Sequence, residues 1–197
     1  MIKVSTVVEG GGEVVALPVL LRRIQEWVDP SIYVNILPPI KVKRDRFIGK
    51  EDEFRRYVAL AGAKCEINGW VIILMDADDD CPVKLGKELL VRAKTVLGHD
   101  RVSVVLANRE YEAWFIAAAK SLSGYRGFSL AKGEEVADPD RPRNAKGWMG
   151  ERMGGYSETL DQPAFSAIMD LQLAFDRSRS FRKLCTEWRL QLSRVKT

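Results

Sequence analysis

Acidic side chains follow three apolar runs of the sequence, at the points where those runs end. The runs cover residues 2–8, 70–75 and 102–107, and the acids that come after them are Glu9 and Glu13, then Asp76, Asp78, Asp79 and Asp80, then Glu110 and Glu112. Carboxylates brought together repel one another unless a cation or a shared proton relieves the repulsion. Oxygen ligands without His or Cys suit Mg²⁺ or Mn²⁺, and the chemistry that such sites support is phosphoryl transfer or phosphodiester hydrolysis.

The elements that must position these acids alternate along the first part of the chain. We predict strands over residues 2–8, 32–37, 70–75 and 102–107, each followed by a helix, at 14–28, 51–65, 82–97 and 111–122. This alternation predicts an α/β fold with a right-handed, largely parallel central sheet sandwiched by helices. Because parallel strands bring their carboxyl ends to one edge, the acids that follow them are expected to meet there.

A second interpretation applies to several of these acids. Asp79 and Asp80 precede Pro82, so they also fit the N-terminus of a helix, where carboxylates cap exposed N–H groups, and Glu110 fits a first-turn acid of the next helix. The glycines at 10–12 lack the GxGxxG spacing of a dinucleotide site and the Lys-Ser/Thr of a phosphate-binding loop. The metal interpretation is therefore the stronger one for Glu9 and Asp76.

The composition excludes several classes of protein. The 197 residues carry a net charge of +4, and no apolar run approaches the length of a membrane span. The three cysteines are not in CxxC pairs, which argues against a disulfide framework or a zinc site, and the single histidine, His99, argues against His-based catalysis. The chain starts directly on a strand-like run, so we expect no secretory signal and a cytoplasmic location.

The pattern changes after residue 122. We divide the chain into an α/β core over 1–122, a glycine-rich loop or lid over 123–160, and C-terminal helices over 161–197 that pack on the core, within one domain overall. Helices are expected at about 163–175 and 179–195. The second of these is amphipathic, so its apolar stripe must be buried on the core or on a partner.

Basic residues that would contact phosphates lie near the predicted acidic edge. The region from Lys41 to Arg56 is rich in Lys and Arg and follows the second strand. The candidates for binding a nucleic-acid backbone are Lys43, Arg44, Arg46, Arg109 and Lys146. The alternatives are a solvated loop and helix face for the first three, an ion pair with the acids for Arg109, and a surface loop for Lys146.

The acids and their spacing resemble a known family. Glu9-Gly10 after a strand, followed by Asp76-x-Asp78 after a later strand, resembles the Toprim domain, and Val8-Glu9-Gly10-x-x-Glu13 with Pro18 looks most like its version in the overcoming-lysogenisation-defect (OLD) type nucleases. Most of the chain also resembles a Toprim-like bacterial family, domain-of-unknown-function family 4276. The segments that carry this resemblance include residues 8–10, 36–39, 43–45, 74–82, 107–115, 145–148 and 159–162.

The resemblance implies a catalytic site and a metal. It assigns catalysis to Glu9, Asp76 and Asp78, with Mg²⁺ or Mn²⁺ held by ligands from the set Glu9, Glu13, Asp76, Asp78, Asp80 and Glu110, and it leaves Glu112 as a further candidate. The implied activity is phosphodiester cleavage in DNA or RNA, in a subunit of a bacterial defence or repair system. No helicase, zinc or topoisomerase module is present in this chain, so strand passage and complete primase action are not expected.

Two alternatives to the nuclease stay open. The first is a non-catalytic Toprim-like subunit of an ATPase complex, which predicts an exposed apolar patch near residues 165–195. The second is another metal-dependent phosphotransfer enzyme acting on nucleotides. The partners expected are nucleic acid and, for the first alternative, an ATPase protein; a homodimer is left open, and no membrane is expected.

Overall fold

A parallel sheet lies at the centre of the protein. In the computed structural model, which describes residues 1–131, 133–134 and 138–195, the strand order is β2-β1-β4-β5. The strands are β1 (Ile2–Val8), β2 (Val34–Ile36), β4 (Trp70–Asp76) and β5 (Val102–Ala107), and every pair is parallel. The predicted α/β fold with its largely parallel sheet is confirmed.

A short strand that the sequence analysis missed extends the edge of this sheet. β3 (Ile40–Lys41) pairs with β1 at Val7 and Val8, on the side where β2 pairs with Ile2 to Val4. The two strands are separated by Pro38-Pro39, which have no N–H to donate to β1. The chain therefore leaves the edge at the prolines and returns to it, which carries Lys41 to the carboxyl end of β1.

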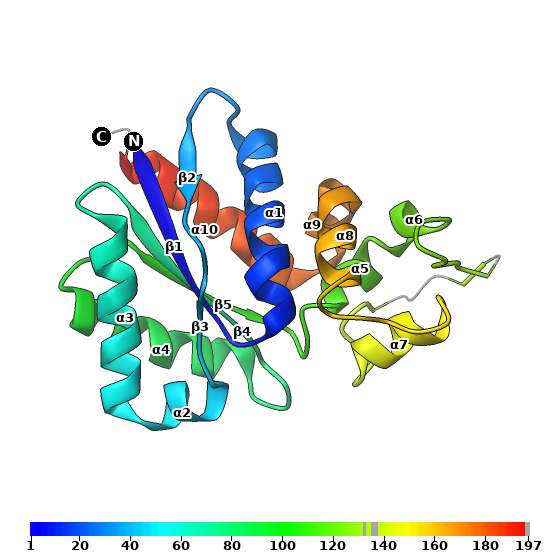
Figure 1. Ribbon diagram of the computed structural model, residues 1–197, viewed down its shortest axis with the longest axis horizontal. Helices are drawn as coiled ribbons and strands as arrows, with labels where there is room; N and C mark the ends of the chain where they lie inside the picture. The colour runs from blue at the N-terminus through cyan, green and yellow to red at the C-terminus, as the bar shows by residue number, and fades with distance from the viewer. Residues whose placement is uncertain (132, 135–137, 196–197) are drawn as a thin grey trace.

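Helices cover both faces of the sheet (Figure 1). One face packs on α1 (Gly11–Val28) and α10 (Arg179–Val195), and the other packs on α3 (Glu51–Cys65) and α4 (Pro82–Leu97). Because side chains alternate along a strand, Ile72 and Leu74 of β4 face the first layer while Ile73 and Met75 face the second. β4 is buried along its whole length, as expected for a central parallel strand.

The amphipathic C-terminal helix packs on the core, which is one of the two positions expected for its apolar stripe. Phe181, Leu184 and Trp188 of α10 are buried in the same cluster as β4 and α1, and the Trp188 ring lies 5.0 Å from the ring of Trp70. The indole N–H of Trp188 donates a hydrogen bond of 2.8 Å to the Gln25 side chain of α1. The apolar stripe is therefore covered by the chain itself.

Several helices differ from their predicted bounds. Part of the predicted basic loop forms α2 (Arg44–Gly49), and the predicted lid contains α7 (Ala145–Glu151). Asn144 caps the start of α7, because its side chain accepts the N–H of Gly147. The helix predicted at 111–122 is divided into α5 (Ala113–Ala117) and α6 (Ala119–Leu122). The helix predicted at 163–175 is divided into α8 (Asp161–Ile168) and α9 (Leu171–Arg177), because Asp170 caps a new start.

Some of the predicted segments extend beyond what the structure describes. Residues 132 and 135–137 of the predicted lid, and residues 196–197 of the C-terminal segment, lie outside the described residues. Within the described part of the chain, no helix has the length and apolar character needed to cross a membrane.

Candidate active site at the carboxyl edge of the sheet

Glu9 connects the ends of two neighbouring strands. It follows β1 directly, and its Oε1 accepts a hydrogen bond of 2.9 Å from the backbone N–H of Asp76, the last residue of β4. The Oδ1 of Asp76 in turn accepts the backbone N–H of Tyr111, at 2.8 Å, from the segment after β5. The carboxyl ends of β1, β4 and β5 are therefore joined through two carboxylates, as the direction of the strands predicts.

The turns after β4 and β5 have unusual backbone conformations. Asp78 and Arg109 both have positive φ angles, 49° and 63°, in the left-handed region that non-glycine residues seldom adopt. The backbone N–H of Asp78 donates to the carbonyl of Arg109 at 3.0 Å, so each turn supports the other. Backbone strain of this kind is concentrated at functional sites, where the surrounding structure maintains it.

An outer group of acids, Glu9, Asp78 and Asp80, lies on the exposed side of this edge and surrounds Arg44. The guanidinium of Arg44 lies 2.5 Å from Asp80 Oδ2, 3.5 Å from Asp78 Oδ2 and 3.9 Å from Glu9 Oε2. Its Nε also donates to the backbone carbonyl of Asp76 at 3.2 Å. Arg44 is thus the cation that neutralises the outer group.

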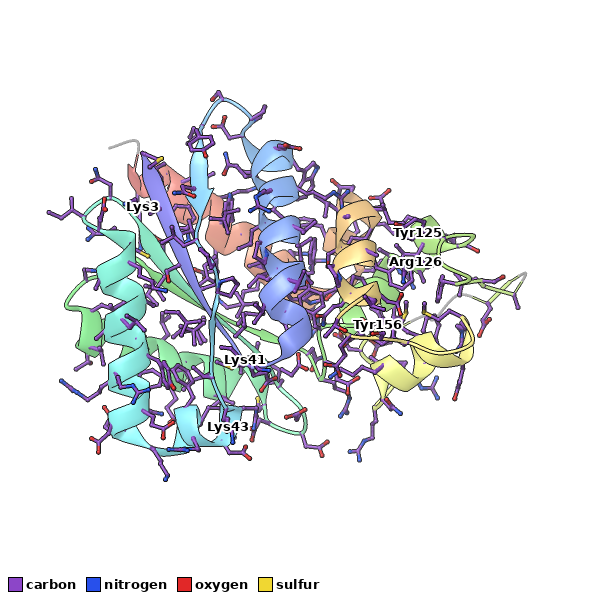
Figure 2. The ribbon with its side chains drawn as sticks, viewed as in Figure 1. Lys3, Lys41, Lys43, Tyr125, Arg126 and Tyr156 are labelled. Carbon is purple, nitrogen blue, oxygen red and sulfur yellow. The ribbon has the colours of Figure 1, made fainter. Side chains whose placement is uncertain are left out.

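An inner group of acids, Glu13, Asp76 and Glu112, lies deeper. All three are buried, and Glu112 has no exposed surface. The side-chain amide of Gln162 donates to both Glu13 Oε1 and Glu112 Oε1, at 3.3 and 3.1 Å, and the Tyr156 hydroxyl donates to Glu112 Oε1 at 2.8 Å. Figure 2 shows Tyr156 on the side of α1 that faces α7 and α8, opposite Lys41 and Lys43.

The inner group carries polar atoms without partners. Within the described part of the structure, Oε2 of Glu13, Oε2 of Glu112 and Oε1 of Gln162 are buried and have no hydrogen-bond partner. Burying such atoms without a partner costs free energy, so each requires an explanation, such as a bound cation or a proton. Two of these oxygens belong to carboxylates of the inner group and one to the amide of Gln162. Together they form a set of possible metal ligands that is buried rather than exposed to solvent.

The burial of these acids changes their protonation. Burial raises the pKa of Glu112 to about 7, against the lowering effects of Lys146 and of the hydrogen bond from Tyr156. Burial, followed by the charges of Glu112, Glu9 and Glu13, raises the pKa of Asp76 well above its usual range. The pKa of Glu9 is also raised, by burial, although the hydrogen bond from the Asp76 N–H opposes the change. Burial therefore disfavours the charged forms of Glu112, Asp76 and Glu9, and a proton or a nearby cation would relieve that cost.

Lys146 of α7 supplies positive charge to the inner group. Burial lowers its pKa, but the charges of Glu112, Glu158 and Asp76 outweigh burial and raise it overall. Its Nζ lies 3.0 Å from a carboxylate oxygen of Glu158, and its backbone N–H donates to Glu110 Oε2 at 3.0 Å. Glu110 therefore holds the first turn of α7 against the edge of the sheet.

Gly10 and Gly12 make room for the inner group. A Cβ atom on Gly10 would lie 2.0 Å from Glu13 Oε2, and one on Gly12 would lie 2.1 Å from Gln162 Oε1 and 2.8 Å from the Glu158 carbonyl. Neither glycine has a positive φ angle, so both are needed for close approach rather than for an unusual turn. This explains the glycine run, whose spacing does not match a nucleotide-binding fingerprint.

The types of side chain at this edge are those that bind Mg²⁺. The side chains are carboxylates and one amide, the oxygen ligands that Mg²⁺ prefers, and two of the buried carboxylate oxygens are unpartnered. No group of three or more His, Cys, Asp and Glu side chains within the described ranges has the arrangement needed to hold a metal ion. The Arg44 guanidinium occupies the centre of the outer group, so a metal ion there requires Arg44 to withdraw.

The predicted phosphate-binding cations are mostly paired with acids. Arg44 contacts the outer group, Arg46 pairs with Glu53, and Arg109 pairs with Asp79 at 3.3 Å. Lys146 pairs with Glu158, whereas the side-chain ammonium of Lys43 forms no hydrogen bond or ion pair with any described residue. For Arg109 the ion-pair interpretation therefore matches the structure.

The capping interpretation of the strand-end acids is wrong. α4 begins at Pro82 after Cys81 as its N-cap, with no side-chain cap hydrogen bond, and Asp80 contacts Arg44 instead. Likewise α5 begins only at Ala113, and Glu110 is bonded to the first turn of α7. The acids after β4 therefore belong to the edge of the sheet rather than to the following helix.

Two members of the inner network had no role in the sequence analysis. Gln162 lies 149 residues from Glu13 and 50 from Glu112, and Tyr156 lies 44 residues from Glu112. The only signal in the sequence was the resemblance of residues 159–162 to the family, which assigned Gln162 no contact. Glu112 was a further candidate, and the structure places it in the inner group.

Comparison with known proteins gives a family but no named relative. No curated protein and no solved structure matches the chain significantly. One family model, described as Domain of unknown function (DUF4276), matches residues 8–189, which include both groups of acids and the helices that enclose them. By that match over most of its length, the chain belongs to the DUF4276 family.

Proposed function

We propose that this protein is a Toprim-like, metal-dependent nuclease that cleaves phosphodiester bonds in DNA or RNA. The observation that supports the proposal most strongly is the meeting of carboxylates from three parallel strand ends at one edge of the sheet. Glu9, Asp76 and Asp78 come from the ends of β1 and β4, and Glu112 comes from the segment after β5. Such an edge is where open α/β sheets place their sites.

The proposed ligands for Mg²⁺ or Mn²⁺ are the acids closest to the ends of β1 and β4. Glu9, Asp76 and Asp78 are the central candidates, and Glu13, Asp80 and Glu110 complete the set from which the remaining ligands come. A bound Mg²⁺ would lower the pKa of a coordinated water and stabilise the leaving oxygen. Of the additional candidates, Asp80 is paired with Arg44, and Glu110 accepts the backbone N–H of Lys146.

The other side chains have proposed roles in binding and proton transfer. Glu112, with its pKa raised to about 7, holds a proton at its unpartnered Oε2 below neutral pH and releases it above. Lys43 supports binding of a phosphate backbone as an unpaired cation among the described residues. Arg44, Arg46, Arg109 and Lys146 contribute by exchanging their carboxylate partners for phosphates.

A cleavage assay tests the proposal. Purified protein with Mg²⁺ or Mn²⁺ should nick plasmid DNA or degrade single-stranded DNA or RNA, and Glu9→Gln and Asp76→Asn should each reduce the rate by about 10²-fold or more, since each removes charge from the site where charge develops in the reaction. Asp52→Asn, at an exposed position of α3, is the matched control and should retain full activity. Circular dichroism would establish that all variants are folded.

Equal cleavage by wild type and Asp76→Asn would contradict the proposal. The non-catalytic alternative predicted an exposed apolar patch near residues 165–195. Phe165, Phe181, Leu184 and Trp188 are buried, and the large apolar side chains exposed in the described part of this range are Ile168 and Leu190. The phosphotransfer alternative would be favoured if a mononucleotide, rather than an oligonucleotide, raised the melting temperature in a Mg²⁺-dependent way.

A further inference from the structure

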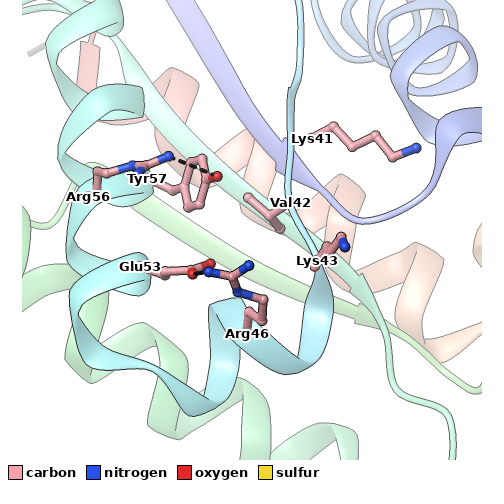
Figure 3. Close-up of a pocket in the computed structure, with 7 residues that line it drawn as sticks. All are labelled: Lys41, Val42, Lys43, Arg46, Glu53, Arg56 and Tyr57. Atoms are coloured by element: carbon pink, nitrogen blue, oxygen red, sulfur yellow. Dashed lines mark hydrogen bonds and ion pairs between the residues drawn. The ribbon is translucent and has the colours of Figure 1, made fainter.

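A basic pocket lies beside the acidic edge, between the end of β3 and helices α2 and α3. Its volume is about 420 Å³, within the range of sites that hold small molecules or single nucleotides. Its lining includes four cations, one acid and one aromatic ring: Lys41, Lys43, Arg46, Arg56, Glu53 and Tyr57 (Figure 3). None of these residues belongs to the outer or inner group of acids.

The charge of this pocket is only partly neutralised. Glu53 pairs with Arg46, which leaves Lys41, Lys43 and Arg56. Within the described ranges no carboxylate forms an ion pair with any of these three. Figure 3 shows the Lys41 side chain extending from β3 away from Arg56 and Tyr57, so the cations lie on both sides of the end of β3. Cations placed in this way attract a ligand with several negative charges, as a chain of phosphates has.

The pocket also offers flat surfaces for a base. The Arg56 guanidinium lies 4.8 Å from the centroid of the Tyr57 ring and donates to the Tyr57 hydroxyl at 3.1 Å. This hydrogen bond, drawn in Figure 3, orients the guanidinium plane. Unpaired bases stack on aromatic rings and on arginine guanidinium planes in proteins that bind single strands.

Lys41 and Lys43 of the pocket lie next to residues of the acidic edge. Lys43 directly precedes Arg44, whose guanidinium contacts Glu9, Asp78 and Asp80. The Nζ of Lys41 lies 3.5 Å from the position that a Cβ on Gly11 would take, two residues after Glu9. A strand whose phosphate lies at the acids therefore has Lys41 and Lys43 within reach of the neighbouring phosphates.

We propose that this pocket binds one unpaired nucleotide of a single-stranded nucleic acid, next to the bond that the acids cleave. Lys41 and Lys43 contact the phosphates, and the base lies against Arg56 and Tyr57. In a duplex the bases are stacked inside the helix and do not enter such a hollow, so the pocket selects single strands. The position of the cleaved bond rests on the proposed function, whereas binding by the pocket does not.

Binding without metal tests the pocket separately from cleavage. Fluorescence anisotropy in EDTA would compare a labelled single-stranded oligonucleotide with a duplex of the same sequence. The wild type should bind the single strand more tightly, and Lys41→Glu with Lys43→Glu should weaken that binding by at least about tenfold. The slope of log K against log salt should become shallower by about 0.7 for each phosphate that the variant no longer neutralises.

A matched pair of substitutions controls for net charge. Lys64→Glu with Lys120→Glu makes the same change of charge at exposed positions on the last turn of α3 and on α6. This pair should bind the single strand as the wild type does. If both pairs weaken binding equally, the attraction is a property of the whole charge and the pocket is not the site.

The base contact has its own test. Tyr57→Leu should weaken binding of the single strand by about 5- to 150-fold, the range measured for loss of stacking on one base. An abasic strand should bind the wild type more weakly by a similar factor, which gives the same information if Tyr57→Leu fails to fold. Equal affinity for normal and abasic strands would overturn the base contact.

The two proposals fail in different ways. Binding of single strands that depends on Lys41 and Lys43, together with no cleavage in Mg²⁺ or Mn²⁺, would overturn the nuclease and support the pocket. Normal cleavage and normal binding by the Lys41→Glu, Lys43→Glu protein would overturn the pocket and leave the nuclease standing. A duplex bound as tightly as the single strand would also overturn the pocket.

Discussion

The outer and inner groups of acids stand at the same edge of one sheet, yet their charges are neutralised in different ways. In the outer group, Asp78 and Asp80 are more than half exposed, and Arg44 contacts both of them and Glu9. In the inner group, Glu13, Asp76 and Glu112 are buried, and two of their oxygens have no partner in the described part of the protein.

This difference follows from what each group contacts. Where an arginine reaches the carboxylates, the ionised form is satisfied by charge and hydrogen bonds. Where burial removes water, as at Glu112 and Asp76, a proton or a nearby cation must neutralise the buried charge. The inner group is therefore the part of the site whose stability should respond most to pH.

The largest expected effect is the pH dependence of the inner group. The pKa of Glu112 is raised from 4.5 to about 7, so between these values the folded protein holds a proton that the unfolded chain has released. The free energy of unfolding of the metal-free protein should therefore fall as pH rises from about 4.5 to 7, by about 3 kcal/mol for this group. The raised pKa values of Asp76 and Glu9 act in the same direction.

Glu112→Gln should flatten this dependence. Urea unfolding at several pH values would measure it, with Glu88→Gln, at an exposed position of α4, as the matched control that keeps the wild-type slope. If the free energy of unfolding changes with pH equally in wild type and Glu112→Gln, Glu112 does not hold the proton in the folded protein. The two groups of acids would then not differ in the way described.

Arg44→Gln tests the outer group. Its removal leaves Glu9, Asp78 and Asp80 without their shared cation, so the metal-free variant should be less stable by about 2 kcal/mol, in the range for hydrogen bonds to charged groups. Because the outer carboxylates are then free to bind another cation, Mg²⁺ should raise the melting temperature of the variant more than that of the wild type.

Arg92→Gln is the control for this comparison. Arg92 is also partly buried and pairs with acids, Glu51 of α3 and Glu88 of α4, but neither of them belongs to the outer or the inner group. Mg²⁺ should stabilise Arg92→Gln no more than the wild type. If Mg²⁺ also fails to give Arg44→Gln an extra rise in melting temperature, the outer group does not bind the metal where Arg44 lies.

The smallest effect is expected at Asp79. Its side chain is 81% exposed, and its contacts with Arg109 and Arg143 are 3.3 and 3.6 Å long. Exposed ion pairs of this kind contribute between about 0 and 1 kcal/mol. Asp79→Asn should therefore leave both the melting temperature and its response to Mg²⁺ nearly unchanged, and a loss comparable to that of Arg44→Gln would place Asp79 inside the outer group.

Much of the fold could be predicted from local patterns. The buried run at 70–75 and the acids that follow it predicted β4 and its carboxyl end correctly, because a central parallel strand is apolar on both faces. β3 was missed because two residues after a pair of prolines carry no periodic signal. The break between α8 and α9 was missed because the apolar pattern continues through Met169, while the cap at Asp170 depends on a single side-chain hydrogen bond.

The candidate site was predictable in its acids but not in their partners. The strand-end position of Glu9 and Asp76 is a local feature of the sequence, and chain direction alone brings such residues to one edge. Arg44 lies among Glu9, Asp78 and Asp80 because α2, which packs on α3, places it beside residues that follow β4, 36 positions along the chain from Arg44 to Asp80. No periodicity encodes such a contact.

The sequence by itself determined which residues can do chemistry and at which edge of the sheet they gather, because strand direction and hydrophobic pattern are local properties. Only the tertiary structure decided which acids are buried, which are paired with Arg44, and which share Gln162, a residue 149 positions from Glu13. These choices depend on packing between distant segments, and burial and neighbouring charge then set the pKa of each carboxyl group.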